Sequence, residues 1–366
     1  MFKEEKEIKY GNAFNLITGV GAVCLNNIFE FFKGSFSKAW EAEPFAIKQA
    51  VLNETSFKEI LKQRKEIDPE KEWEKIKNKG ARAITRNSSD YPRLLKEIYI
   101  PPALLYYIGD IRFLNDNSSV AVVGTRRASE YGLNASFNLS RDLTLNGINI
   151  ISGLALGIDA KAHQGCLEAG GKTCAVLGSG ILEIQPKTNL WIADKIIKSG
   201  GVVVSEYSPF LKAEKWTFPQ RNRIVAGLSR LAIIVEAPAK SGALITAKFA
   251  LDMNRDVGVV PGEITSIMSR GSNNLLKYGA FPILKAEDAL EILGVKNNSD
   301  FAVQYFFDED EKRIIENINE SVSINELFDK TGIDLKTLNQ KITMLEIKGA
   351  VECLSGQVKV LKRKPL

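Results

Sequence analysis

The sequence predicts an α/β protein with a mostly parallel sheet, flanked by an N-terminal helical domain and a C-terminal winged helix. Between residues 119 and 260 there are six almost continuous apolar runs, and helical lengths with polar faces separate most of them. Continuous apolar strands are buried on both faces, as in a parallel sheet covered by helices. The runs are Val120–Val123, Ile148–Ile151, Thr173–Leu177, Val202–Ser205, Leu231–Val235 and Val257–Val260.

The length of 366 residues exceeds that of a usual single domain, so two or three domains are expected. The changes of pattern along the chain predict a helical domain over 1–80 and an α/β domain over 81–294. A polar linker over 295–307 then leads to a winged-helix domain over 308–366.

The N-terminal domain is predicted to be helical because Lys38–Ile47 and Pro69–Lys77 are charged with spaced apolar positions. A Gly-x-Gly turn, Thr18–Ala22, opens another apolar-spaced segment, as in a SAM-like or helix-hairpin-helix-like domain. The free N–H groups of such a turn can meet a phosphate. The simpler interpretation is a turn that closes a small helical bundle, because glycine is permissive in any turn.

A proline-rich segment from Asp90 to Asp110 is predicted to be an extended crossing into the α/β domain. At the other end of the chain, three short helices are expected at Glu311–Glu320, Ser323–Lys330 and Asp334–Lys348. A hairpin signal at 351–361 follows them. Three helices and a hairpin describe a winged helix-turn-helix.

The cysteine usage and the N-terminus both favour a cytoplasmic protein. The four cysteines have no metal-ligand spacing, which predicts a reducing compartment without a disulfide framework. The charged first residues lack the apolar core of a signal peptide, and no apolar run is long enough to span a bilayer, so no membrane association is expected.

The net charge of +5 comes from the middle of the chain. Residues 1–80 hold 14 Lys and Arg against 13 Asp and Glu, and residues 308–366 hold 10 against 11. This excess is too small for a protein that coats duplex DNA, but it allows a local basic pocket. A further interpretation is that the protein is an interaction scaffold built on the winged helix. Because residues 308–366 carry a net charge of −1, this domain is expected to contact a protein or to play an accessory role rather than to bind phosphates.

The stretch Phe218–Ile224 is the most informative part of the sequence. It lies between two buried-strand patterns, which predicts a proline-containing loop where the parallel sheet ends, the usual ligand site of an open α/β fold. Arg221, Asn222 and Arg223 are hard to explain there as core residues, although an ion pair with Asp159 or Glu206 would be a structural explanation.

Lys215, Trp216 and Phe218 suggest how this edge could bind a nucleic acid. Single strands are held by a base stacked on an aromatic ring with a cation at the phosphate. The alternative is that Trp216 and Phe218 are core anchors and that Lys215 is only solvated, since aromatic side chains are usually buried. The neighbouring arginines favour the binding interpretation.

The other strand ends carry small or polar residues, which allow close approach of a ligand. Val123 is followed by Gly124-Thr125-Arg126-Arg127, and Ile151 by Ser152-Gly153. After Glu236, Lys240-Ser241-Gly242-Ala243 opens a helix and forms another possible anion cradle.

No cofactor or metal is expected. A dinucleotide fingerprint needs Gly-x-Gly-x-x-Gly after the first strand, whereas this chain has arginines there, and it has no Walker loop. The arginines fit a phosphate or a nucleic-acid backbone better. His163 is the only histidine, which excludes a multi-histidine metal site, and a structural role is preferred because no nucleophile is evident beside it.

From Val122 to Ala280 the chain resembles the DprA/Smf family of DNA-processing proteins of natural transformation. The matching motifs are Val123–Arg127, Ser152–Ala160, Ala162-His163, Ala175–Gly178, Ser205–Tyr207, Phe218–Ile224, Glu236-Ala237, Ser241–Ala247, Pro261-Gly262 and Gly271–Asn273. The resemblance implies an extended Rossmann-like domain that binds single-stranded DNA, dimerises, and helps to load the RecA recombinase while displacing single-strand-binding protein. The chain departs from the family pattern at Gln185-Pro186, where the family usually has Tyr-Pro.

The family pocket carries over to Arg126, Ser152-Gly153, Lys215, Phe218 and Arg221–Arg223, and the strand ends above add the remaining candidates. The expected DNA-binding residues are thus Gly124, Thr125, Arg126, Arg127, Ser152, Gly153, Lys215, Phe218, Arg221, Asn222, Arg223, Ser241 and Gly242.

The leading hypothesis is a non-enzymatic single-stranded-DNA-binding protein that protects incoming DNA and loads a RecA-type recombinase. The alternative is a Rossmann-like nucleotide or nucleoside-phosphate hydrolase with Glu206 or Glu236 as its base. No motif places a water activator for that reaction.

Overall fold

The computed structural model describes residues 2–115, 118–295, 308–318, 321–347, 350–354 and 356–360. The chain forms two compact units, Met1–Asn297 and Asn298–Leu366, and each is considered by itself. Apart from Val295, the linker expected over 295–307 lies outside the described residues, as do the expected helix ends at 319–320 and Lys348 and parts of the expected hairpin.

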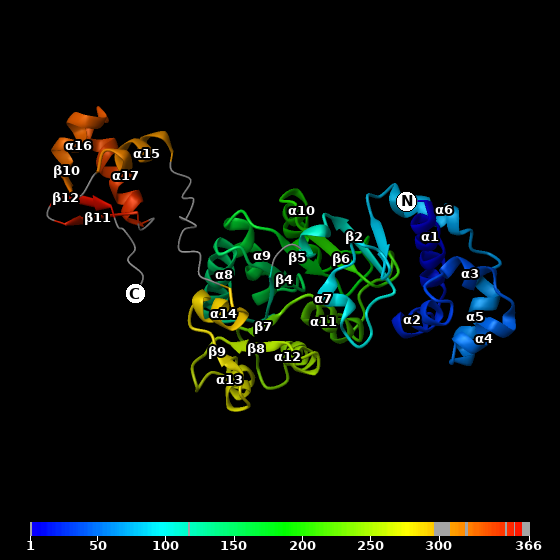
Figure 1. Cartoon of the computed structure of the whole chain (residues 1–366). Coiled ribbons are helices and arrows are strands. Elements are labelled where there is room, and N and C mark those ends of the chain that lie inside the picture. Colours follow the sequence, from blue (N-terminus) through cyan, green and yellow to red (C-terminus); the bar gives the residue numbers. More distant parts are fainter. Residues whose placement is uncertain are drawn as a thin grey trace. The chain divides into compact units, whose positions relative to one another are not determined.

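The first unit contains a nine-stranded sheet in the order β1-β2-β6-β5-β4-β3-β7-β8-β9 (Figure 1). All six expected strands are confirmed, and from β6 to β9 neighbouring strands are parallel. The strands are β1 (Arg82–Thr85), β2 (Leu104–Gly109), β3 (Ser119–Val123), β4 (Asn149–Ser152), β5 (Thr173–Val176), β6 (Val202–Ser205), β7 (Leu231–Ile234), β8 (Asp256–Val259) and β9 (Phe281–Pro282).

The expectation of an extended crossing over Asp90–Asp110 was wrong in part. The segment contains a short helix, α7 (Arg93–Lys96), and the strand β2, which pairs antiparallel with β1 and β6. Pro101 and Pro102 lie just before β2, where their missing N–H groups break no ladder hydrogen bond, so prolines and a strand are compatible here.

Helices cover both faces of the sheet. Because successive strand residues point to opposite faces, Val120 and Val122 pack against one set of helices while Ala121 and Val123 pack against the other. The first face carries α8 (Glu130–Leu145), α9 (Ile158–Glu168), α10 (Leu190–Lys198) and α14 (Ala286–Leu293), and the second carries α7, α11 (Thr217–Gly227), α12 (Gly242–Asp252) and α13 (Arg270–Lys277).

Strand order determines where a ligand can enter. After β3 the chain adds β4, β5 and β6 on one side, and it then crosses to the other side of β3 to add β7 and β8. The helices that follow β3 and β7 therefore lie on opposite faces. Beside the carboxyl ends of these two strands the connections diverge and leave a crevice.

The N-terminal residues form a helical bundle against the β1–β2 end of the sheet (Figure 1). The expected helix Pro69–Lys77 is confirmed as α6, whereas the one expected over Lys38–Ile47 is divided because Pro44 starts a new helix and cannot continue the preceding one. The helices are α1 (Phe2–Leu16), α2 (Ala22–Phe31), α3 (Phe36–Glu41), α4 (Pro44–Ala50), α5 (Glu54–Gln63) and α6 (Pro69–Lys77).

The Gly-x-Gly turn precedes α2 and is tied into the bundle, since the Ser56 hydroxyl of α5 donates to the Gly19 carbonyl at 2.8 Å. The bundle and the sheet share one apolar core, so no gap in packing marks the boundary expected at residue 80. That boundary and a helix-hairpin-helix assignment remain predictions.

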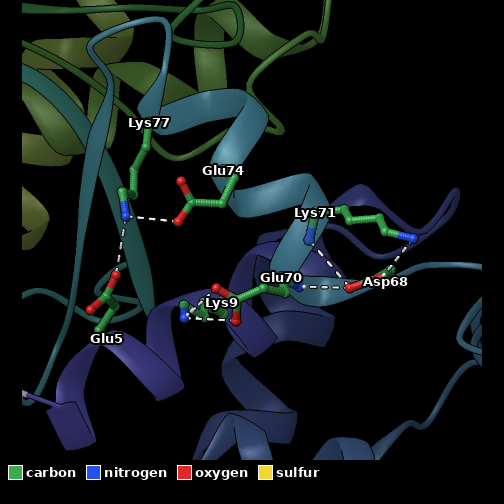
Figure 2. Close-up of polar contacts among 7 residues, drawn as sticks. All are labelled: Glu5, Lys9, Asp68, Glu70, Lys71, Glu74 and Lys77. Atoms are coloured by element: carbon green, nitrogen blue, oxygen red, sulfur yellow. Dashed lines mark hydrogen bonds and ion pairs between the residues drawn. The ribbon is translucent and has the colours of Figure 1, made fainter.

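Ion pairs join α1 to α6 on the surface of the bundle (Figure 2). The ammonium of Lys9 lies 2.7 Å from both carboxylate oxygens of Glu70, and Lys77 reaches Glu5 at 3.3 Å and Glu74 at 2.8 Å. Exposed pairs of this kind contribute little to stability, because solvent and salt screen them. The position of α1 therefore depends mainly on buried contacts.

The main polar contact of α1 with the sheet is at Tyr106 on β2, whose side chain is fully buried. Its hydroxyl donates to Asn12 Oδ1 at 2.9 Å and accepts from Asn15 Nδ2 at 3.3 Å. Asn15 Nδ2 also donates to the Glu206 carbonyl at the end of β6, at 3.1 Å. These bonds fix α1 beside the carboxyl end of the sheet.

The second unit contains α15 (Glu309–Glu316), α16 (Ile324–Thr331) and α17 (Leu335–Ile347) with a three-stranded antiparallel sheet. Its strands are β10 (Val322–Ser323), β11 (Val351–Leu354) and β12 (Gln357–Val360). The expected turn between the last two helices is present, and Gly332 has a φ of 68° there, which favours glycine. The three helices and the hairpin follow in the expected order, whereas the short strand β10 between the first two helices was not expected. The winged-helix assignment remains a prediction.

Among the described residues, no helix has the length and apolar character needed to cross a membrane.

We expect Tyr106→Phe to destabilise the first unit by about 2 kcal/mol, because it leaves buried Asn12 Oδ1 without its donor and removes one of the two hydrogen bonds of Asn15 Nδ2. Urea unfolding followed by tryptophan fluorescence measures this loss. Tyr99→Phe removes the same atom from a side chain that is 91% exposed and should leave the midpoint unchanged. Equal stability of the two variants would contradict the role of Tyr106.

Candidate nucleic-acid interface

A cavity of about 360 Å³ lies at the carboxyl ends of β3 and β7, where the strand order reverses. Its walls come from the ends of several strands and from the helices that follow them, because parallel strands all end at the same edge. Ten of the thirteen expected residues line it: Gly124, Thr125, Arg126, Arg127, Gly153, Phe218, Arg221, Asn222, Ser241 and Gly242. The other three, Ser152, Lys215 and Arg223, do not.

The expectation that Phe218–Ile224 forms a loop was wrong. These residues lie in α11, which begins at Thr217, and Pro219 is accommodated because the first turn of a helix needs few N–H donors. The helical period separates the two arginines, so that Arg221 lies in the floor of the cavity and Arg223 lies outside it.

Arg221 was expected to be too polar for the core, yet only 3% of it is exposed. Its Nη1 donates to the Gly153 carbonyl at 2.7 Å and also to the Val176 carbonyl, so the guanidinium joins the ends of β4 and β5. A Cβ at position 153 would lie 2.2 Å from this nitrogen. Glycine is therefore required at position 153 by the buried guanidinium.

Asp159, at the start of α9, compensates the charge of Arg221. One carboxylate oxygen accepts from the Gly153 N–H at 3.1 Å. Burial raises the pKa of Asp159 and the nearby Arg221 opposes this, while burial lowers the pKa of Arg221 and Asp159 opposes that shift. Each group thus opposes the effect of burial on the pKa of the other.

Arg223 makes the structural ion pair that the sequence left open. Its Nη2 contacts the Glu206 carboxylate, and its Nη1 donates to the Ile100 carbonyl at 2.6 Å. Both side chains of the pair are largely buried. Arg223 thereby fastens α11 to the end of β6, and a direct contact of Arg223 with DNA remains a prediction.

The mouth of the cavity carries the cations that remain free. Arg126, Arg127 and Lys240 are exposed, and none of them makes an ion pair with another described residue. The Arg126 guanidinium lies 4.5 Å from the centre of the half-buried Phe218 ring, a cation–π contact. Lys240 was expected to belong to an anion cradle but was not among the thirteen expected DNA-binding residues, and it lines the cavity.

Lys215 and Trp216 lie beside the cavity, just before α11. Lys215 is exposed, and Trp216 is 52% exposed with its ring edge-on to Tyr207 at 6.0 Å. The interpretation of Trp216 as a core anchor is thus wrong. The segment before α11 thus offers an exposed cation and an accessible ring, although neither side chain lines the cavity.

The N-terminus of α12 supplies backbone donors to the opposite wall. Ser241 caps the helix by accepting from the Ala243 N–H at 3.3 Å, and Asn222 Nδ2 donates to the Gly242 carbonyl at 3.1 Å. Helix N-termini favour anions. Asn222 therefore ties α11 to α12 across the cavity.

Ser152 and Thr125 are buried and support the strand ends. The Ser152 hydroxyl donates to the Val122 carbonyl at 2.7 Å and lies outside the cavity. Thr125 Oγ1 accepts from the Arg127 N–H at 3.2 Å and so shapes the turn that displays the two arginines.

The two glutamates considered as catalytic bases have other partners. Glu206 pairs with Arg223, and Glu236 accepts from the Ser129 N–H at 2.9 Å and from its hydroxyl at 2.5 Å, at the start of α8. Neither glutamate lines this cavity. In the part of the chain that the structure describes, no group of three metal-ligating side chains is found.

A second cavity, of about 600 Å³, adjoins the first. Arg126, Gly153, Ala155 and Phe218 line both cavities. Gln185, where the chain departs from the family pattern, lines the second one, as do Leu156, Glu183, Lys187 and Lys212. The sequence did not predict that these lining residues lie together, because they come from segments that share no motif.

An open α/β sheet with free cations and a ring at its switch point is the type of site at which proteins of this class hold nucleotides or nucleic acids. The chain belongs to the family described as DNA recombination-mediator protein A, whose model matches residues 82–294. Protein Smf of Synechocystis is 39% identical over 292 residues, which cover 79% of this chain and 73% of Smf. The DNA processing protein DprA of Bacillus subtilis is 36% identical over 71% of this chain and 90% of its own length.

Two solved structures agree with this membership. DprA from Streptococcus pneumoniae superimposes with a TM-score of 0.69 at 32% identity, covering 77% of this chain and 97% of that one. DprA from Helicobacter pylori, whose structure is reported for its single-stranded DNA binding mode, gives 0.53 at 30% identity over 58% of this chain and 95% of that one.

The buried His163 predicts a pH dependence of stability. Burial and the charge of Arg221 lower the pKa of His163 to about 3, and its Nδ1 lies 2.7 Å from Thr173 Oγ1. Between that value and the ordinary pKa near 6.5, the unfolded chain binds a proton that the folded chain does not. The free energy of unfolding therefore decreases as the pH falls through this range, by roughly 1.4 kcal/mol per pH unit.

We expect His163→Gln, which cannot gain this charge, to lose stability less steeply than the natural chain below pH 6. Urea unfolding of both proteins at pH 7, 6 and 5 measures the difference. His163 is the only histidine, so the comparison isolates one imidazole. Parallel pH profiles would contradict a neutral buried histidine.

Proposed function

We propose that this protein binds single-stranded DNA in the crevice at the ends of β3 and β7. The observation that carries the proposal is the stacking of Arg126 on Phe218 in the cavity wall, where Arg127 and Lys240 also lie and make no ion pair with another described residue. A base can stack on an accessible ring while flanking phosphates meet cations and helix N–H groups. The single-stranded DNA binding named for the Helicobacter pylori relative supports this.

Single strands fit the crevice better than duplex DNA. The overall charge of +5 is modest, and the free cations border a cavity rather than form a broad stripe. Duplex binding relies on many phosphate contacts along an exposed surface. A confined site that presents rings suits bases that are already unstacked.

The proposal assigns binding rather than catalysis to this site. Glu206 and Glu236 are engaged in structural contacts, which leaves the hydrolase hypothesis without its two suggested bases. Release of phosphate or free base from common nucleotides would argue against this assignment.

The proposal extends to the cellular role expected of the family. The protein would act in the cytoplasm, protect incoming strands during natural transformation and DNA uptake, and load a RecA-type recombinase on them. It would form a homodimer through its Rossmann-like unit. The C-terminal unit would be a winged helix that faces a protein or plays an accessory role, since its segment carries a net charge of −1.

We expect Arg126→Ala to weaken single-strand binding by about 1–3 kcal/mol, because it removes a phosphate contact and the cation that covers Phe218. The slope of log affinity against log salt should fall by about one. Fluorescence anisotropy with a labelled oligonucleotide measures both quantities.

Arg230→Ala is the matched control for this variant. Arg230 is exposed and precedes β7, at the opposite edge of the sheet, so the same charge is removed far from the crevice. Equal losses in the two variants would mean that only net charge matters, and unchanged binding by a folded Arg126→Ala protein would refute the site.

We expect the natural chain to increase RecA-dependent strand exchange on DNA covered by single-strand-binding protein, and Arg126→Ala to increase it less. A loading factor must first hold the strand that it delivers. Joint-molecule formation measured over time tests this. Stimulation that is independent of Arg126 would separate loading from the crevice.

A further inference from the structure

We propose that the second cavity holds one unstacked base of the bound strand and prefers bases that carry an exocyclic amino group, with Glu183 as the selecting residue. This inference rests on the proposed binding of single-stranded DNA. It goes beyond that function because it assigns a base preference to a protein whose other contacts address phosphates and ring faces.

The two cavities are adjacent parts of one path. Arg126 and Phe218 line both of them, so a strand that stacks on Phe218 in the first cavity places its next nucleotide beside the second. The volume of about 600 Å³ is within the range of small-molecule sites, and a flat base is of that class.

The second cavity has the two surfaces that a nucleotide needs. Ala155, Leu156 and Pro186 provide an apolar wall for the faces of a base. Lys187 and Lys212 are exposed, and neither makes an ion pair within the described ranges, so both can meet the flanking phosphates.

Glu183 and Gln185 are the groups that can contact the edge of such a base. Both side chains are half-buried in the lining. Neither has a side-chain hydrogen bond to any other residue that the structure describes, in contrast to Glu206 and Glu236. An acidic side chain in a site for a polyanion costs binding energy unless it accepts a hydrogen bond from the ligand.

The chemistry of the two side chains assigns selection to Glu183. The amide of Gln185 both donates and accepts, so it can match either kind of base edge. The ionised carboxylate of Glu183 only accepts, which suits the N4 amino group of cytosine and opposes the O4 carbonyl of thymine or uracil. Enzymes that hold flipped bases also form hydrogen bonds to the Watson–Crick edge of the base, which includes position 4 of a pyrimidine.

Oligonucleotides of deoxycytidine and deoxyuridine, equal in length and label, test the proposal because cytosine presents an N4 amino donor where uracil presents O4, and an N3 acceptor where uracil presents N3–H. At one salt concentration the natural chain should bind the deoxycytidine strand about five-fold more tightly or better. Glu183→Gln keeps the shape and gains a donor for O4, so the affinity ratio should fall to about one.

Glu214→Gln is the control, because it removes the same charge from an exposed residue that lines neither cavity. It should retain the preference of the natural chain. Equal binding of both strands by the natural chain would overturn the base preference but leave single-strand binding in place, as would a preference that persists in Glu183→Gln. Failure to bind either strand would overturn the proposed function itself.

Discussion

The buried guanidinium of Arg221 is the interaction on which the crevice depends. It joins the carbonyl of Gly153, at the end of β4, to the carbonyl of Val176, at the end of β5, and Asp159 compensates its charge. A buried charge persists only with such partners, because its desolvation would otherwise cost several kcal/mol. Removing Arg221 or Asp159 alone would leave the other charge without its compensating partner under the floor.

This arrangement separates two uses of arginine within one site. Arg221 and Arg223 spend their donors on carbonyls and a carboxylate, so they hold α11 against the sheet. Arg126 and Arg127 lie in the turn after β3 and keep their donors for a ligand. Planar guanidinium groups suit both tasks, since they bind several acceptors at once.

Helix α11 also connects the crevice to the N-terminal bundle, through Glu206 at the end of β6. The carboxylate of Glu206 forms an ion pair with Arg223 of α11, and the backbone carbonyl of Glu206 accepts a hydrogen bond from Asn15 of α1. Because hydrogen bonds run from α1 through Glu206 and Arg223 to α11, and α1 shares an apolar core with the sheet, the bundle supports the position of the crevice. The N-terminal helices are thus part of the framework of the crevice.

The sequence by itself determined the parallel sheet, the edge proposed for ligand binding, and most residues of the crevice, because apolar runs and strand-end glycines are local patterns. Tertiary structure decided which polar residues line the crevice and which are buried in structural contacts. Arg221 and Arg223 share one motif, but the helical period and the carbonyls around α11 bury one under the floor and pair the other with Glu206. The set of Glu183, Lys187 and Lys212 is assembled only by folding, since no spacing along the chain predicts that these segments meet.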